Sequence, residues 1–168
     1  MMTDGARTEG ARAFQASETR TLTITPAVDE AIRAHGQQTY PHECCGALLG
    51  RDGHVTDLVA LPNTTEEGPR RRFLVRAGDY RQAEQRATEL GVELLGFYHS
   101  HPDHPARPSQ YDLDHAWPTF AYIIVAVAQG AAMEMTVWFL KDDRSSFEEG
   151  TLHHGENPHP DAAPAVYR

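Results

Sequence analysis

The sequence predicts a single α/β domain in which two or three helices flank a mixed β-sheet. Long apolar segments at 120–128 and 133–140 are typical of strands in the middle of a sheet. Segments with helical periodicity alternate with shorter strand-like segments, as expected for an α/β fold. The chain has 168 residues, which suits one ordinary domain with its own hydrophobic core.

Composition is that of a soluble globular protein, with 23% charged and 40% apolar residues. The formal charge of −9 argues against a nucleic-acid partner, because phosphate binding needs clustered Lys and Arg. We expect no membrane segment, since no window approaches the roughly 20 apolar residues that a spanning helix needs. The first twenty residues also lack the apolar core of a signal peptide.

Cysteine usage indicates a reducing compartment. The two cysteines, Cys44 and Cys45, are adjacent and form neither a disulfide framework nor a CxxC metal motif. Free cysteines of this kind usually behave as small buried residues. We therefore predict a cytoplasmic protein.

The pattern of residues 1–40 predicts a tail, a strand and a helix, in that order. Residues 1–17 are polar and aperiodic, which favours a disordered tail. Residues 21–24 alternate as a short strand does. Thr25 and Pro26 begin a helix with proline at its first position. This helix should end near Tyr40, because the residue before a proline avoids helical geometry.

A β-hairpin follows. Residues 45–49 form a compact apolar strand, the Asp-Gly dipeptide at 52–53 is a hairpin turn, and 54–61 form the partner strand. Residues 62–69 have the composition of a loop. Residues 72–75 predict a brief strand.

A second helix precedes the strand that carries the histidines. Asp79 can cap this helix and Gly91 can end it. The apolar residues that recur with helical period are Tyr80, Ala83, Ala87 and Leu90. Residues 92–98 then form a strand.

The last part of the chain predicts a short helix at 109–117 and an edge strand at 147–152. The folded domain should therefore span residues 18–152. From His153 onward Gly, Pro and His dominate, and we expect a flexible tail over 153–168.

Two histidines at the end of the 92–98 strand are candidate metal ligands. Side chains at i and i+2 of a strand share a face, with Cα atoms roughly 6–7 Å apart. His99 and His101 can therefore bind one ion at about 2.0–2.1 Å, while Ser100 must point to the opposite face. Pro102 and Pro105 should end the strand and stiffen the loop that follows.

Asp112 supplies a third ligand, with Asp103 and Asp114 as alternatives. Two imidazoles and one carboxylate leave the fourth tetrahedral position to water, as in catalytic rather than structural zinc sites. The residues thus predict one catalytic Zn²⁺ per chain.

A hydrolytic zinc site also needs a base and an oxyanion donor. Spacing alone leaves three candidates for the base: Glu43, Glu89 and Glu93. Ser109 can donate to an oxyanion, although Ser-x-x-Asp is also close to a helix capping box. The two roles of Ser109 are compatible.

The order of these residues resembles the JAMM (MPN+) metalloprotease motif, written here as His99-x-His101-Pro102-x6-Ser109-x2-Asp112. Residues 41–50 resemble the segment that carries the catalytic glutamate of that family, and the likeness spans roughly residues 20–152. The resemblance implies an MPN, cytidine-deaminase-like architecture and a zinc metallopeptidase. It implies zinc ligands at His99, His101 and Asp112, a general base at Glu43 and an oxyanion donor at Ser109.

The resemblance is closest to the short prokaryotic branch, which includes enzymes that trim ubiquitin-like sulfur-carrier proteins. It implies a partner with a glycine-rich C-terminus and hydrolysis of a peptide or isopeptide bond there. Only 55 residues separate Glu43 from His99, so we do not expect a long substrate-recognition insertion of the eukaryotic deubiquitinase kind between them. A catalytically inactive MPN scaffold and a DNA-repair-associated relative are the alternatives, and the oligomeric state stays open.

Overall fold

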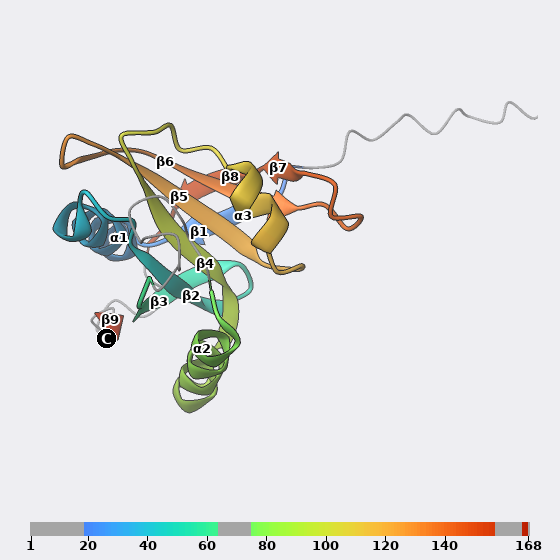
Figure 1. The fold of residues 1–168 in the computed structure, drawn as a ribbon. Helices are drawn as coiled ribbons and strands as arrows, with labels where there is room; N and C mark the ends of the chain where they lie inside the picture. Colours follow the sequence, from blue (N-terminus) through green and yellow to red (C-terminus); the bar gives the residue numbers. More distant parts are fainter. Residues whose placement is uncertain (1–18, 64–74, 157–165, 168) are drawn as a thin grey trace, which may run out of the picture.

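A nine-stranded mixed β-sheet with flanking helices forms the fold, as the sequence predicted (Figure 1). The computed structural model describes residues 19–63, 75–156 and 166–167. The strand order is β7-β6-β5-β4-β2-β3-β1-β8, and β9 also pairs with β3. The strands are β1 (Thr21–Ile24), β2 (Cys45–Arg51), β3 (His54–Leu61), β4 (Glu93–Pro102), β5 (Ala121–Ala128), β6 (Ala131–Leu140), β7 (Phe147–Glu149), β8 (Thr151–His154) and β9 (Val166–Tyr167). The helices are α1 (Pro26–Thr39), α2 (Ala77–Leu90) and α3 (Gln110–His115).

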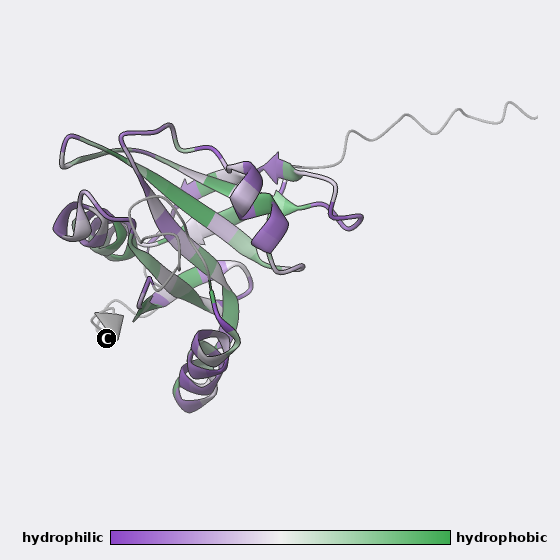
Figure 2. Cartoon of the chain, in the orientation of Figure 1, coloured by the Kyte–Doolittle hydropathy of each residue, from purple (hydrophilic) through white to green (hydrophobic). Residues whose placement is uncertain are grey.

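The two faces of the sheet carry separate hydrophobic clusters, because side chains alternate along each strand. On one face, Val28 and Ile32 of α1 belong to the cluster that contains Tyr98 of β4. On the other, Ala83 of α2 belongs to the cluster that contains Phe97. Figure 2 shows hydrophobic residues along the central strands and hydrophilic residues over much of α2. Among the described residues, no helix is long and apolar enough to cross a membrane.

Helix α1 begins and ends where the sequence predicted. Pro26 occupies the first turn, and the hydroxyl oxygen of Thr25 accepts a hydrogen bond from the Val28 N–H at 3.1 Å. This bond satisfies one of the N–H groups that a helix start leaves without a helical partner. The helix ends at Thr39, directly before Tyr40 and Pro41.

The start of α2 differs from the prediction. The helix begins at Ala77 with Arg76 as its N-cap residue, and no side chain makes a capping hydrogen bond. Asp79 therefore does not cap the helix. It lies in the first turn, where a carboxylate interacts favourably with the helix dipole. Gly91 does end the helix, with φ of 68° in the left-handed region.

The predicted edge strand at 147–152 is wrong in one respect, because it is two strands that meet at Gly150. β7 pairs with β6 and β8 pairs with β1, so consecutive segments occupy the two ends of the strand order. The Gly150 N–H donates to the Val137 carbonyl, and the next N–H donates to the Arg20 carbonyl, both at 2.8 Å. Glycine is required because a Cβ here would lie 2.4 Å from the Phe139 ring.

The predicted tail segments fall partly outside the described residues. Residues 1–17 and 72–74 lie outside them, and Val75 is not in a strand. β8 extends to His154, so the segment predicted to be flexible from His153 onward begins with two strand residues. β9 pairs in parallel with Leu58 and Val59 of β3.

Candidate metal centre

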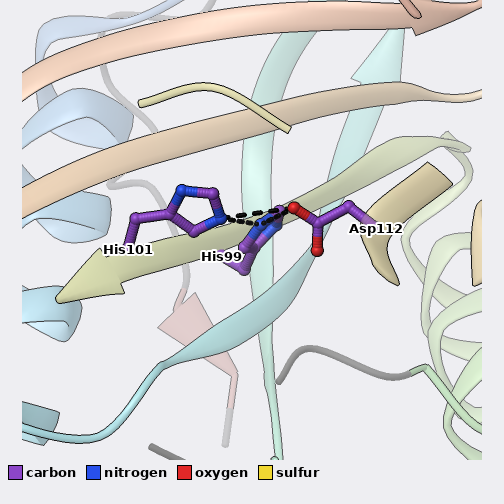
Figure 3. Close-up of side chains that lie close together, drawn as sticks. All are labelled: His99, His101 and Asp112. Atoms are coloured by element: carbon purple, nitrogen blue, oxygen red, sulfur yellow. Dashed lines mark hydrogen bonds and ion pairs between the residues drawn. The ribbon is translucent and has the colours of Figure 1, made fainter. Parts of the chain in front are cut away.

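Strand β4 and helix α3 bring His99, His101 and Asp112 together (Figure 3). The two Nε2 atoms are 3.0 Å apart. The Asp112 Oδ2 atom lies 3.4 Å from the His99 Nε2 atom and 3.3 Å from the His101 Nε2 atom. All three residues are buried. As predicted, Ser100 points to the opposite face, where its hydroxyl oxygen accepts a hydrogen bond from the Cys44 N–H at 2.8 Å.

This triangle of donor atoms fits a small tetrahedral cation. Bonds of about 2.0–2.1 Å at the tetrahedral angle place ligand atoms about 3.3–3.4 Å apart. The observed separations of 3.0, 3.3 and 3.4 Å are close to these values. Two imidazole nitrogens and a carboxylate oxygen are also a donor set that suits zinc. The three residues can therefore hold a metal ion with one coordination position left for another group.

The ring of His101 is held by the loop after β4. Its Nδ1 atom lies 2.9 Å from the Pro105 carbonyl oxygen, which can only accept a hydrogen bond. Nδ1 therefore carries the hydrogen and Nε2 presents its lone pair to the cluster. Carbonyl partners of this kind commonly fix the tautomer of metal-binding histidines.

A capping box orients Asp112 at the start of α3. The Ser109 N–H donates to Asp112 Oδ2 at 2.8 Å, and the Asp112 N–H donates to the Ser109 hydroxyl oxygen at 3.1 Å. The capping role that the sequence allowed for Ser109 is thus present. In this contact the hydroxyl acts as an acceptor, so its hydrogen can still be donated to another group.

The electrostatics of the site favour the protonation states that bind metal. Burial alone would raise the pKa of Asp112, but its close contacts with His99 and His101 and the hydrogen bond from the Ser109 N–H bring it well below its usual range. Burial lowers the pKa of His99, and the Asp112 carboxylate only partly offsets this. Metal binding requires an ionised carboxylate and neutral imidazoles, so both shifts act in the same direction.

Glu43 lies beside the cluster, directly before β2. Cys45 pairs with His99 across the β2–β4 ladder, and the Ser100 N–H donates to the Cys44 carbonyl at 3.2 Å. Glu43 is the next residue along the chain, directly before Cys44, so its backbone lies close to the end of β4 that carries the histidines. Glu43 is only 7% exposed, and the Asn63 side-chain amide donates to its backbone carbonyl oxygen at 3.2 Å.

The other two candidates for the base lie elsewhere. Glu89 is exposed on α2 and pairs with Arg86 at 2.8 Å. Glu93 is exposed opposite Gly50, at the far end of β4 from the histidines. Of the three carboxylates that spacing left open, Glu43 is thus the one beside the cluster.

Asp103 and Asp114, the two alternatives to Asp112, do not belong to the His99–His101–Asp112 cluster found among the described residues. Asp103 accepts hydrogen bonds from the Tyr40 hydroxyl and the Gln129 N–H, at 2.7 and 2.8 Å. Asp114 is exposed and accepts a hydrogen bond from the Gln110 amide at 2.8 Å.

Sequence reasoning missed the contacts that hold the loop after β4. The Pro105 carbonyl bonds to His101, and the Ala106 carbonyl accepts a hydrogen bond from the buried Thr136 hydroxyl at 2.6 Å. Backbone carbonyls are present in every residue, so the sequence held no signal for the first contact. A threonine among the apolar residues of β6 was a weak signal for the second.

Comparison with known families gives one match over most of the chain. Residues 25–141 match the family described as prokaryotic homologs of the JAB domain. The match covers every residue of the cluster together with Glu43 and Ser109.

Relatives of this chain include proteins with named activities. It is 33% identical over 110 residues to a desampylase from Haloferax volcanii, covering 61% of this chain and 78% of the relative. It is 34% identical over 95 residues to a probable TtuB-protein conjugate cleaving protease from Thermus thermophilus, covering 56% of this chain and 63% of the relative. It is also 34% identical over 83 residues to tail tip assembly protein K of Escherichia phage N15, covering 49% of this chain but only 31% of that protein.

Solved structures with the same fold include a protein from Salinibacter ruber, which is 43% identical with a TM-score of 0.64. The alignment covers 82% of this chain and 94% of that one. A JAB1/MPN domain protein from Archaeoglobus fulgidus aligns over 79% of this chain and 97% of its own, with a TM-score of 0.51 and 19% identity. This second likeness confirms the expected MPN architecture.

Proposed function

The chain belongs to the prokaryotic JAMM/MPN family, and from this premise we propose that it is a zinc-dependent metallopeptidase. Its proposed reaction is hydrolysis of a peptide or isopeptide bond at the C-terminal end of a ubiquitin-like or sulfur-carrier protein. The observation that carries the proposal is the buried triangle of His99, His101 and Asp112, with Glu43 beside it.

In this proposal, His99 and His101 hold one zinc ion through their Nε2 atoms and Asp112 holds it through Oδ2. The separations between these atoms support the assignment. When bound, zinc supplies Lewis acidity at the scissile carbonyl. The Pro105 carbonyl keeps the His101 ring in the tautomer that binds metal.

Glu43 acts as the general base and acid. It takes a proton from the attacking water and returns it to the leaving amine, a role that a carboxylate in a buried, water-poor setting performs well. Its low exposure and its position two residues before Cys45, which pairs with His99, support this role. Ser109 donates its hydroxyl hydrogen to the oxyanion, since its capping contact uses the oxygen as an acceptor.

The names of two relatives support the substrate class, because one is a desampylase and the other a probable TtuB-protein conjugate cleaving protease. We propose a substrate that ends in a flexible glycine-rich segment and that meets the enzyme in the cytoplasm. Both cysteines are free and buried, which agrees with a reducing compartment. The intact ligand set and Glu43 disfavour an inactive scaffold, and the net charge disfavours a nucleic-acid partner.

The proposal is tested by incubating the chain with carrier proteins that end in Gly-Gly followed by extra residues, and with carriers linked to a lysine side chain. Intact mass spectrometry should show a carrier ending in Gly-Gly, formed with zinc present and absent after chelation. Re-addition of zinc should restore the product. Failure to process any carrier while the chain binds one zinc would overturn the proposed substrate class.

A further inference from the structure

Asp103 lies at the meeting point of three segments around the cluster. Its Oδ2 atom accepts a hydrogen bond from the Tyr40 hydroxyl at 2.7 Å, and its Oδ1 atom accepts one from the Gln129 N–H at 2.8 Å. Its own N–H donates to the Val127 carbonyl at 2.7 Å. One side chain thus joins the end of α1, the loop after β4 and the turn between β5 and β6.

The backbone of Asp103 also turns the chain sharply at the end of β4. Its φ of 56° lies in the left-handed region, which Asp, Asn and Gly enter more easily than other residues. Two residues later, the Pro105 carbonyl accepts the hydrogen bond from His101, which lies on the strand that has just ended. The reversal at Asp103 is what lets this carbonyl face back toward the strand.

The segments that Asp103 joins carry the two parts of the proposed site. Tyr40 follows α1 and stands three residues before Glu43. The loop that Asp103 begins supplies the carbonyl partner of His101 and then leads into α3, where Asp112 lies. Thr136 holds the same loop at a second point, through the Ala106 carbonyl.

We propose that Asp103 is a positioning residue that keeps the segment carrying Glu43 aligned with the loop that supports His101 and Asp112. This inference rests on the proposed function for the roles of those residues. The side-chain hydrogen bonds that carry this role run from Asp103 to Tyr40 and Gln129, and Asp103 is proposed neither as a metal ligand nor as a substrate contact. It acts through the Tyr40 hydroxyl on one side and through the loop on the other.

Three substitutions separate the effect of Asp103 on the loop after β4 from its effect on the segment before Glu43. Asp103→Gly permits the left-handed backbone but removes both side-chain contacts, so it should lower zinc affinity and kcat by about tenfold each, as loss of supporting contacts around metal ligands commonly does. Asp103→Asn keeps an oxygen acceptor for the Gln129 N–H and should recover most of both losses. Tyr40→Phe releases only the segment before Glu43, so kcat should fall while zinc affinity and KM stay unchanged.

Matched controls make the same chemical changes away from the cluster. Asp143 Oδ1 accepts hydrogen bonds from the Ser145 N–H and hydroxyl, at 2.9 and 2.6 Å, so Asp143→Gly removes a comparable pair of contacts. Tyr80 donates its hydroxyl hydrogen to Glu84 at 2.8 Å on α2, so Tyr80→Phe matches Tyr40→Phe. Neither control should change zinc affinity or kcat.

The experiment measures Zn²⁺ affinity by competition with a chromophoric chelator, and hydrogen exchange of residues 42–45 and 104–112 by mass spectrometry. Both are compared with kcat and KM on a processed carrier. Faster exchange in both segments of Asp103→Gly, but not of Asp143→Gly, is the expected result. Zinc affinity and exchange that match the control would overturn the proposal, and an unchanged kcat in Tyr40→Phe would overturn the link to Glu43. If no carrier is cleaved, affinity and exchange still decide the role of Asp103, while the proposed function fails.

Discussion

His101 and Pro105 are joined by a hydrogen bond of 2.9 Å between the ring Nδ1 atom and a backbone carbonyl. The carbonyl can only accept, so the ring hydrogen is on Nδ1 and the Nε2 lone pair faces His99 and Asp112. The imidazole is therefore held in the tautomer that binds metal by a contact within the protein itself. This reduces the reorganisation needed on binding.

Replacing His101 with Ala should abolish the binding of one zinc ion per chain, because only two of the three proposed ligands, His99 and Asp112, remain. Elemental analysis after gel filtration should fall from about one zinc per chain to near zero. His115→Ala is the matched control, since His115 is exposed and stacks on Tyr111. Retention of a full equivalent of zinc by His101→Ala would contradict the ligand assignment.

Replacing Glu43 with Gln should abolish turnover and leave zinc content unchanged. The amide keeps the size of the side chain but cannot accept the proton of the attacking water. Turnover of a carrier and zinc content are measured on the same preparation. Glu89→Gln, on the exposed face of α2, should behave like the unchanged chain. Measurable turnover by Glu43→Gln would remove it as the base.

The chelated chain should lose stability as pH falls below the usual histidine pKa of 6.5. Burial lowers the pKa of His99 in the folded state, so below this pH the unfolded chain binds more protons than the folded one. The free energy of unfolding should then fall by up to about 1.4 kcal/mol per pH unit for this group. Urea titrations from about pH 7.5 to about pH 5.5 measure the slope, and His99→Gln should flatten it. A stability that rises over this interval would contradict the account.

Gly150→Ala should destabilise the fold, while Gly78→Ala should not. The new Cβ at position 150 would meet the Phe139 ring at 2.4 Å and the Arg20 carbonyl at 2.7 Å, whereas nothing lies within 4 Å at position 78. Overpacking of this kind costs about 1–3 kcal/mol, and Ala at an open helix position gains up to about 1 kcal/mol. Thermal and urea unfolding of both variants provide the comparison. Equal midpoints would show that the junction of β7 and β8 tolerates a side chain.

The thiols of Cys44 and Cys45 should resist alkylation in the folded chain. Burial raises the pKa of Cys44 to about 11 and raises that of Cys45 as well, so little thiolate exists at neutral pH. Iodoacetamide followed by intact mass should add no label to the native chain and two labels after unfolding in guanidinium. Rapid labelling of the native chain would indicate that the start of β2 opens in solution.

The helices and strands that the sequence located correctly are those with strong local signals. Proline at the first turn of α1, the Asp-Gly turn after β2 and Gly91 after α2 each act through the conformation of one or two residues. The alternation of His99, Ser100 and His101 placed the two imidazoles on one face for the same reason. One failure was also local, because Asp79 was predicted to cap α2, whereas the helix begins at Ala77 and Arg76 is its N-cap residue.

The sequence by itself determined the strand period, the limits of α1 and the set of residues able to bind metal. Which carboxylates meet the histidines was decided only by tertiary structure, because neighbours in space depend on strand order. The β2–β4 ladder brings the start of β2 beside His99, and the capping box of α3 turns Asp112 toward both rings. The same applies to the segment around Gly150, whose two strands, β7 and β8, stand at opposite ends of the strand order. Backbone carbonyls such as that of Pro105 have no sequence signature, so their role emerges only when the chain folds.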